Sequence, residues 1–133
     1  MDICPNDITI DNGILKKNNY RVIASDFVNF FYTTWNTQPA NLFSVLNDYS
    51  KLSFKDNIHR GMFILSFFHD IKNGEPFSIV HSWWDALESG SRRIDILVTG
   101  NVTKGLVKYN FVQQFTLAHN DSWKIHNSIL NIF

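Results

Sequence analysis

The chain has little cysteine and little proline: one cysteine and three prolines among 133 residues. The single thiol, Cys4, cannot form a disulfide within the chain, so a reducing compartment, the cytoplasm or the nucleus, fits best. No apolar run approaches the ~18 residues of a membrane span, and the first residues lack the charged and then apolar pattern of a signal peptide. We therefore expect no membrane and no disulfide.

The chain also lacks an excess of charge of either sign. Lys and Arg together number 12, and Asp and Glu together number 12. No basic cluster is larger than a pair, such as Lys16-Lys17 or Arg92-Arg93. Binding to a phosphate backbone needs concentrated positive charge, so we expect no direct nucleic-acid ligand.

Aromatic side chains are abundant by contrast. They supply 15% of the residues, and phenylalanine alone occurs 12 times. A single domain of this length removes roughly two-thirds of its extended-chain surface from water. Large rings dominate burial both in cores and at interfaces, so some of them are available for a partner.

The N-terminal part of the chain predicts two helices. Residues 1–19 are rich in Asn, Asp and Lys, with Pro5 and Gly13 as breakers, and indicate a loosely ordered lead-in before a domain of residues 20–133. Pro39 fits the first turn of a second, short helix. The apolar stripe of the first helix consists of Ile23, Phe27, Phe30, Phe31 and Trp35. The second helix carries Leu42, Phe43, Val45 and Leu46.

The rest of the chain predicts mostly strands. Residues 50–58 indicate a short strand or hairpin, and the next apolar run favours a helix that ends near Asp70 over a strand. An Asn-Gly pair just before Pro76 is a strong break. Four long strands follow, at residues 77–87, 93–102, 107–117 and 123–132. Helices followed by an antiparallel meander are typical of an α+β fold with the helices on one face of a curved sheet.

Five segments, in this order, resemble nuclear transport factor 2 and its relatives. They are Asp26–Thr34, Leu52-Ser53-Phe54 with Arg60-Gly61, Val98-Thr99-Gly100, Phe111–Leu117 and Trp123–Asn127. The resemblance extends from about residue 20 to the end of the chain. It implies an α+β cone whose N-terminal helices pack on a strongly curved antiparallel sheet, with a cavity between helices and sheet and a dimer interface on the open face of the sheet.

This scaffold carries enzymes, carriers and interaction modules, so the fold does not fix the function. One alternative is a homodimeric carrier of Ran-GDP that also binds the phenylalanine-glycine (FG) repeats of nucleoporins. A second is a small cavity enzyme of the ketosteroid isomerase or dehydratase type. We favour a third, a non-enzymatic export cofactor that pairs with itself or with a related domain of an export receptor. Such a cofactor works in nucleus and cytoplasm and at the nuclear pore, and requires no cofactor and no metal.

The resemblance also suggests where partners bind. It implies a dimer interface that contains His81, Trp83, Leu97, Gln114 and Ile129. Strand alternation agrees, because it points Leu97 away from Ile96 and Val98. The carrier has a methionine in the place of Gln114, and this amide indicates either a more polar interface or an ordinary edge glutamine.

A second partner site is implied at the end of the predicted hairpin. Phe54 takes the place of a nucleoporin-contacting tryptophan of the carrier, and Lys55 that of a Ran-contacting glutamate. The loop of residues 103–108, acidic in the carrier, has no carboxylate here. Like charges facing a basic partner oppose association, so these differences make Ran-GDP the less favoured partner.

Five histidines and two aspartates provide the ingredients of acid-base chemistry without an evident arrangement. His81 and Asp85 lie four apart on a predicted strand, which places them on one face but roughly 13 Å apart. No two histidines have the spacing of metal ligands. We expect no catalytic residue among them.

Overall fold

The computed structural model describes residues 13–133, with side chains from Asn19 onward. Cys4, Pro5 and most of the predicted lead-in lie outside the described residues. The helices and strands are α1 (Gly13–Thr37), the 3-10 helix η2 (Pro39–Val45), β1 (Lys51–Phe54), β2 (Asn57–Arg60), α2 (Phe63–Asp70), β3 (Phe77–Glu88), β4 (Arg93–Lys104), β5 (Val107–His119) and β6 (Trp123–Ile132).

All predicted helices and strands are present, and the α+β class is confirmed. The main difference in extent is that α1 begins at Gly13, several residues before its apolar stripe. The helix predicted to end near Asp70 is α2. The break before Pro76 contains two residues with positive φ, Asn73 and Gly74, a conformation that glycine and asparagine adopt more readily than other residues.

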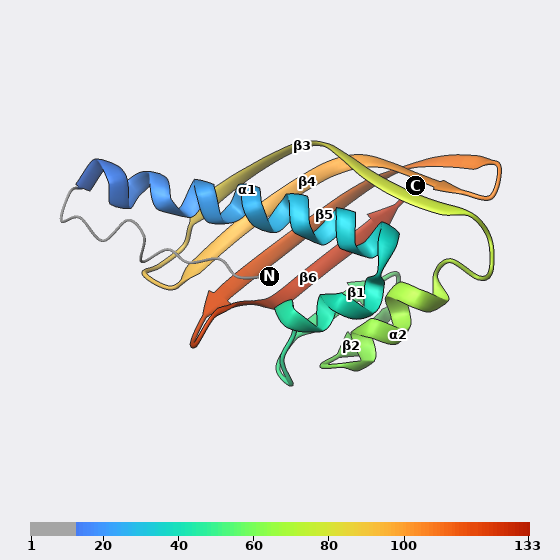
Figure 1. The fold of residues 1–133 in the computed structure, drawn as a ribbon, viewed down its shortest axis with the longest axis horizontal. Helices are drawn as coiled ribbons and strands as arrows, with labels where there is room; N and C mark the ends of the chain where they lie inside the picture. Colours follow the sequence, from blue (N-terminus) through green and yellow to red (C-terminus); the bar gives the residue numbers. More distant parts are fainter. Residues whose placement is uncertain (1–12) are drawn as a thin grey trace.

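The sheet has six strands in the order β2-β1-β6-β5-β4-β3 and curves beneath the helices (Figure 1). Strands β3 to β6 form the predicted antiparallel meander. One pairing departs from the antiparallel pattern, because β1 pairs with β6 in parallel. After β2 the chain passes through α2 to the far edge of the sheet, returns strand by strand, and reaches β1 with β6 running in the same direction.

The core lies between α1 and the sheet and consists largely of rings. The ring of Phe31 is 4.9 Å from that of Phe115 on β5 and 5.5 Å from that of Phe68 on α2. Trp35 donates its indole hydrogen to the backbone oxygen of Phe68, 3.1 Å away. The predicted stripe of α1 is therefore the buried one, with Phe30 at its partly buried margin. Phe43 of η2 differs from its apolar neighbours, since it is 57% exposed.

Gly100 sits where β3 and β4 approach each other too closely for a side chain. A Cβ at this position would lie 2.1 Å from the backbone oxygen of Val80 and 2.7 Å from a ring carbon of Phe111. We expect Gly100→Ala to lower the free energy of unfolding by about 1–3 kcal/mol, because a backbone atom must move to admit the methyl group. Urea denaturation measures the loss. The exposed Thr103→Ala on the same strand is the control, and equal losses in both variants would contradict the prediction.

Candidate partner-binding site

The face of the sheet opposite the described helices carries large apolar side chains. Leu97 of β4 pairs with Gln114 of β5, and Gln114 pairs in turn with Ile129 of β6. Trp83 of β3 lies one row away, opposite Thr99. Trp83, Leu97 and Ile129 are 50%, 42% and 52% exposed, so this surface is an apolar patch in the single chain. We call Trp83, Leu97, Gln114 and Ile129 the outer-face residues.

The predicted alternation is confirmed for β4. Ile96 and Val98 are buried on the helix side, whereas Leu97 between them is exposed. Gln114 is only partly buried. Its amide nitrogen donates hydrogen bonds to the Phe115 oxygen at 3.0 Å and to Thr116 Oγ1 at 3.1 Å. The nitrogen therefore already has partners within its own strand, and it does not by itself call for a polar partner chain.

His81 does not lie on the outer face, contrary to the expectation. A bulge follows it on β3: His81 pairs with Gly100, but Trp83 already pairs with Thr99, so Ser82 is an extra residue. An extra residue reverses the alternation of faces from that point on. His81 consequently faces the helices, with its ring 5.7 Å from that of Tyr32.

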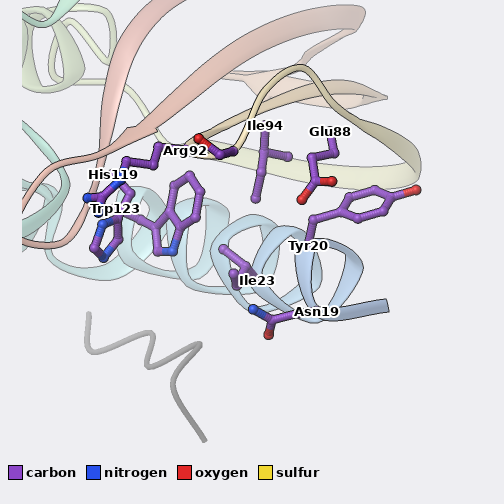
Figure 2. Close-up of a pocket in the computed structure, with 9 residues that line it drawn as sticks. Asn19, Tyr20, Ile23, Glu88, Arg92, Ile94, His119 and Trp123 are labelled. Atoms are coloured by element: carbon purple, nitrogen blue, oxygen red, sulfur yellow. The ribbon is translucent and has the colours of Figure 1, made fainter. Parts of the chain in front are cut away.

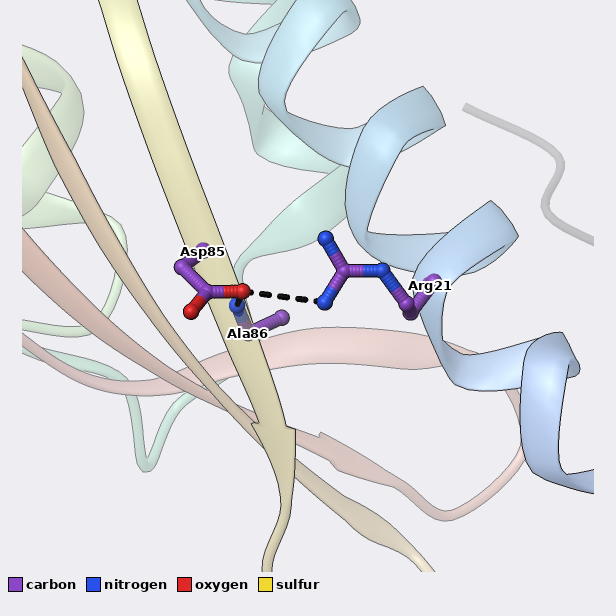
Figure 3. Close-up of polar contacts among 3 residues, drawn as sticks. All are labelled: Arg21, Asp85 and Ala86. Atoms are coloured by element: carbon purple, nitrogen blue, oxygen red, sulfur yellow. Dashed lines mark hydrogen bonds and ion pairs between the residues drawn. The ribbon is translucent and has the colours of Figure 1, made fainter.

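The same bulge separates His81 from Asp85, which the regular alternation places on one face. Asp85 instead accepts a hydrogen bond at 2.9 Å from Arg21 of α1 (Figure 3). This bond, followed by one from the backbone N–H of Ala86, lowers the pKa of Asp85. Arg21 also lies over the ring of Trp84, 5.1 Å from its centroid. Asp85 thus helps to join α1 to β3 and does not form an acid-base pair with a histidine.

Phe54 and Lys55, predicted as a partner site, lie together at a cavity of about 440 Å³. Lys55 occupies the β1–β2 turn with a φ of 54°, and its Nζ is 5.4 Å from the centroid of the Phe54 ring. The cavity, here called the Phe54 cavity, is lined by Phe54, Lys55, Asp70, Ile71, Asn73, Phe77, Val102, Lys104, Tyr109, Ile132 and Phe133. Lys55, where the carrier has a glutamate, therefore lines the same cavity as Lys104, which comes from the loop without carboxylates. Asp70 is an anion in the same lining.

Several residues of the Phe54 cavity were not predicted. They include Phe77 at the start of β3, Tyr109 near the start of β5 and Ile132 at the end of β6. The hairpin of β4 and β5, with Lys104 opposite Val107, brings such strand ends to one edge. Gly105, between the predicted strands of residues 93–102 and 107–117, indicates this hairpin, but the position of β6 beside β1 has no comparable local signal.

The interior contains a buried chain of polar groups. Tyr32 Oη donates to Gln113 Oε1 at 2.9 Å, and Gln113 Nε2 donates to Ser128 Oγ at 3.0 Å. The Ser128 hydroxyl donates in turn to the Gln114 backbone oxygen at 2.8 Å. Burial raises the pKa of Tyr32 well above its ordinary value, so this phenol stays protonated at neutral pH. This series of hydrogen bonds joins α1 to β5 and β6. None of its three side chains is a carboxylate or an imidazole.

The described part of the chain contains no group of three or more His, Cys, Asp and Glu side chains suited to a metal ion. None of its helices combines the length and the apolar character needed to cross a bilayer.

The fold and the site define a cone-shaped α+β domain with rings packed in its interior and an apolar outer face. The chain belongs to the nuclear transport factor 2 (NTF2) domain family, whose model matches residues 23–132. Comparison with curated protein sequences finds no match.

Solved structures show the same fold in proteins of different kinds. Nuclear transport factor 2 from Cryptosporidium parvum is 23% identical, with a TM-score of 0.76 over 86% of this chain and 94% of that one. A chain of the complex of the yeast deubiquitinase Ubp3 with its cofactor Bre5 is 22% identical, with a TM-score of 0.71 over 86% and 96%. The hexachlorocyclohexane dehydrochlorinase LinA-type3 from Novosphingobium barchaimii LL02 is 12% identical, with a TM-score of 0.74 over 90% of each chain. At these identities the similarity establishes the fold alone, which enzymes and non-enzymes share.

Proposed function

We propose that this protein is a non-enzymatic nucleocytoplasmic transport factor, an export cofactor that pairs through its outer face with a second copy or with a related domain of an export receptor. It helps to engage FG nucleoporins, and works in nucleus and cytoplasm and at the nuclear pore. The observation that carries the proposal is the outer face itself. Three large apolar residues on three adjacent or near-adjacent strands are about half exposed there, a pattern of interaction surfaces.

The shape of this surface favours a protein partner. It lies on a sheet and is contributed by four strands, β3 to β6, so it is a broad surface rather than a pocket for a small molecule. Its apolar residues are flanked by polar ones such as Thr99 and Thr116. An apolar centre within a polar rim is the usual anatomy of a protein interface.

The filled interior is the reason to prefer a binding module to an enzyme. Rings of Phe27, Phe31 and Phe115 occupy the space between α1 and the sheet, with centroids 4.9 to 5.6 Å apart. The buried side chains of Tyr32, Gln113 and Ser128 are hydrogen-bonded to one another, and the phenol of Tyr32 is not a base at neutral pH. Acid-base catalysis needs a group with a pKa near the working pH that can reach a substrate.

The Phe54 cavity favours the export cofactor over the Ran-GDP carrier. Its aromatic wall remains suitable for the phenylalanine of an FG repeat, which is the role proposed for Phe54. Lys55 and Lys104 add positive charge at its mouth, with Asp70 as a nearby anion. A basic partner surface would be repelled by the two lysines.

We expect light scattering of the purified chain to give the same mass with and without Ran-GDP at micromolar concentrations. Lys55→Glu should strengthen any binding of Ran-GDP by roughly tenfold or more, because it replaces a like-charge contact with an attractive one. Lys55→Gln, which only removes the charge, is the matched control and should have a smaller effect.

A complex of the unmodified chain with Ran-GDP would overturn this ranking and favour the homodimeric carrier. A chain that is monomeric and ignores Ran-GDP would instead require a separate partner. Co-expression with the related domain of an export receptor then provides the direct test of pairing, and failure to pair would count against the export cofactor.

A further inference from the structure

A second pocket lies at the other ends of the long strands, away from the Phe54 cavity. Its volume is about 230 Å³. It is lined by Asn19, Tyr20, Ile23, Glu88, Ser91, Arg92, Ile94, His119 and Trp123. These residues come from α1, from the β3–β4 turn and the strand ends beside it, and from the adjoining ends of β5 and β6, so the pocket is separate from both the outer face and the Phe54 cavity.

The pocket contains a buried donor without a partner. Trp123 is 8% exposed, and its indole Nε1 is the one buried side-chain nitrogen or oxygen in the described part of the chain that has no hydrogen bond. By contrast, the buried indole of Trp35 donates to the Phe68 oxygen. Buried polar groups in proteins are almost always paired, and an unpaired one costs stability. A donor retained at a pocket wall therefore points to an acceptor atom supplied by a ligand.

The charged groups around the pocket are separated into two ends. Figure 2 shows Arg92, His119 and Trp123 at one end and Glu88 with Tyr20 at the other. The ring of His119 lies 5.1 Å from that of Trp123, and its backbone N–H donates to the Arg92 oxygen at 2.9 Å. This backbone hydrogen bond joins the end of β5 to the β3–β4 turn. It therefore holds Arg92 close to the strand ends that carry His119 and Trp123.

We propose that this pocket binds a small zwitterion. The carboxylate of the ligand lies at the first end, where it accepts hydrogen bonds from the guanidinium of Arg92 and the indole N–H of Trp123. Hydrogen bonds between charged partners are among the stronger ones, and they are shorter than neutral ones. The ammonium group of the ligand lies at the Glu88 carboxylate. The volume suits a molecule of several heavy atoms, below the usual range of drug-sized sites.

The test uses the full chain labelled with ¹⁵N and follows the indole N–H resonances of its four tryptophans. Trp123→Phe assigns the Trp123 resonance. The probes are 4-aminobutanoate, butanoate and butylamine, which carry both charges, the carboxylate alone and the ammonium alone. We expect 4-aminobutanoate to shift the Trp123 resonance saturably, with butanoate roughly tenfold weaker and butylamine without effect on it.

Paired variants separate the two ends of the pocket. Arg92→Gln should weaken binding of 4-aminobutanoate by roughly tenfold or more, whereas Arg93→Gln, an exposed neighbour that does not line the pocket, should leave it unchanged. Glu88→Gln should abolish the preference for 4-aminobutanoate over butanoate. Both arginines are exposed, so the variants should fold, and thermal unfolding is the measurement that checks this.

Three results would overturn the proposal. The first is that no probe shifts the Trp123 resonance. The second is that Arg92→Gln and Arg93→Gln bind 4-aminobutanoate equally well. The third is that the Trp123 indole hydrogen of the free protein exchanges with water as slowly as that of Trp35, because the donor is then already bonded within the protein.

Discussion

Replacing Leu97 with glutamate should separate the proposed dimer. Leu97 of β4 lies at the centre of the outer-face residues, opposite Gln114 of β5. A glutamate buried at this position would have no cation opposite it on β5. Truncation or charge reversal at the centre of an interface commonly costs 2 kcal/mol or more, so we expect the dissociation constant to rise by roughly 100-fold. A two-fold dimer would contain the change twice. Sedimentation across a concentration series measures the dissociation.

The matched control for this change is Leu106→Glu. Leu106 is also a leucine exposed in the single chain, but it occupies the β4–β5 turn and does not belong to the outer face. We expect Leu106→Glu to leave the dissociation constant within a factor of about three, as surface substitutions usually do. Circular dichroism should show both variants folded, because neither leucine is in the core. If the two variants dissociate alike, the outer face is not the pairing surface.

If the partner is a related domain of an export receptor, the same pair of variants applies to that complex. Leu97→Glu should then lose the receptor domain while Leu106→Glu retains it. If both variants lose the receptor domain, or if both retain it, the outer face is not the interface.

The direction of the side chains on the outer face was largely predictable because it follows from alternation. Leu97 and Gln114 stand between residues that are buried on the helix side, and the period of two decides their direction without further knowledge. The resemblance implied that His81 also lies on this face, and the structure differs because alternation holds only within an unbroken ladder. The extra residue, Ser82, is a β-bulge that depends on the register between β3 and β4, which no local pattern in the sequence reports.

The two pockets also differ in how far the sequence could predict them. Phe54 and Lys55 adjoin in sequence, so a resemblance over one hairpin was enough to place them together. The second pocket combines α1 with the ends of two distant hairpins, and its residues span positions 19 to 123. The sequence identified Trp123 only as the apolar first residue of a predicted strand. Its unpaired nitrogen is a property of the packed structure, and therefore could not be anticipated from the sequence.

Replacing Phe31 with alanine should remove a large part of the stability of the fold. Its side chain is fully buried, and its ring contacts those of Phe27, Tyr32, Trp35, Phe68 and Phe115. Deleting a buried ring costs about 3–5 kcal/mol, which is a large fraction of the 5–15 kcal/mol typical of a domain. Urea denaturation should show the midpoint falling accordingly. Phe43→Ala, in which an exposed ring is removed, should change the free energy of unfolding by at most about 0.5 kcal/mol.

This comparison also tests the choice between a binding module and a cavity enzyme. A loss of several kcal/mol at Phe31 means that the space between α1 and the sheet is close-packed, because the cost of such a deletion rises with the volume left empty. A loss near that of Phe43→Ala would mean that the interior readily rearranges or admits water. The filled interior would then no longer separate this chain from the enzymes that share its fold, and acid-base chemistry inside the cone would have to be tested directly.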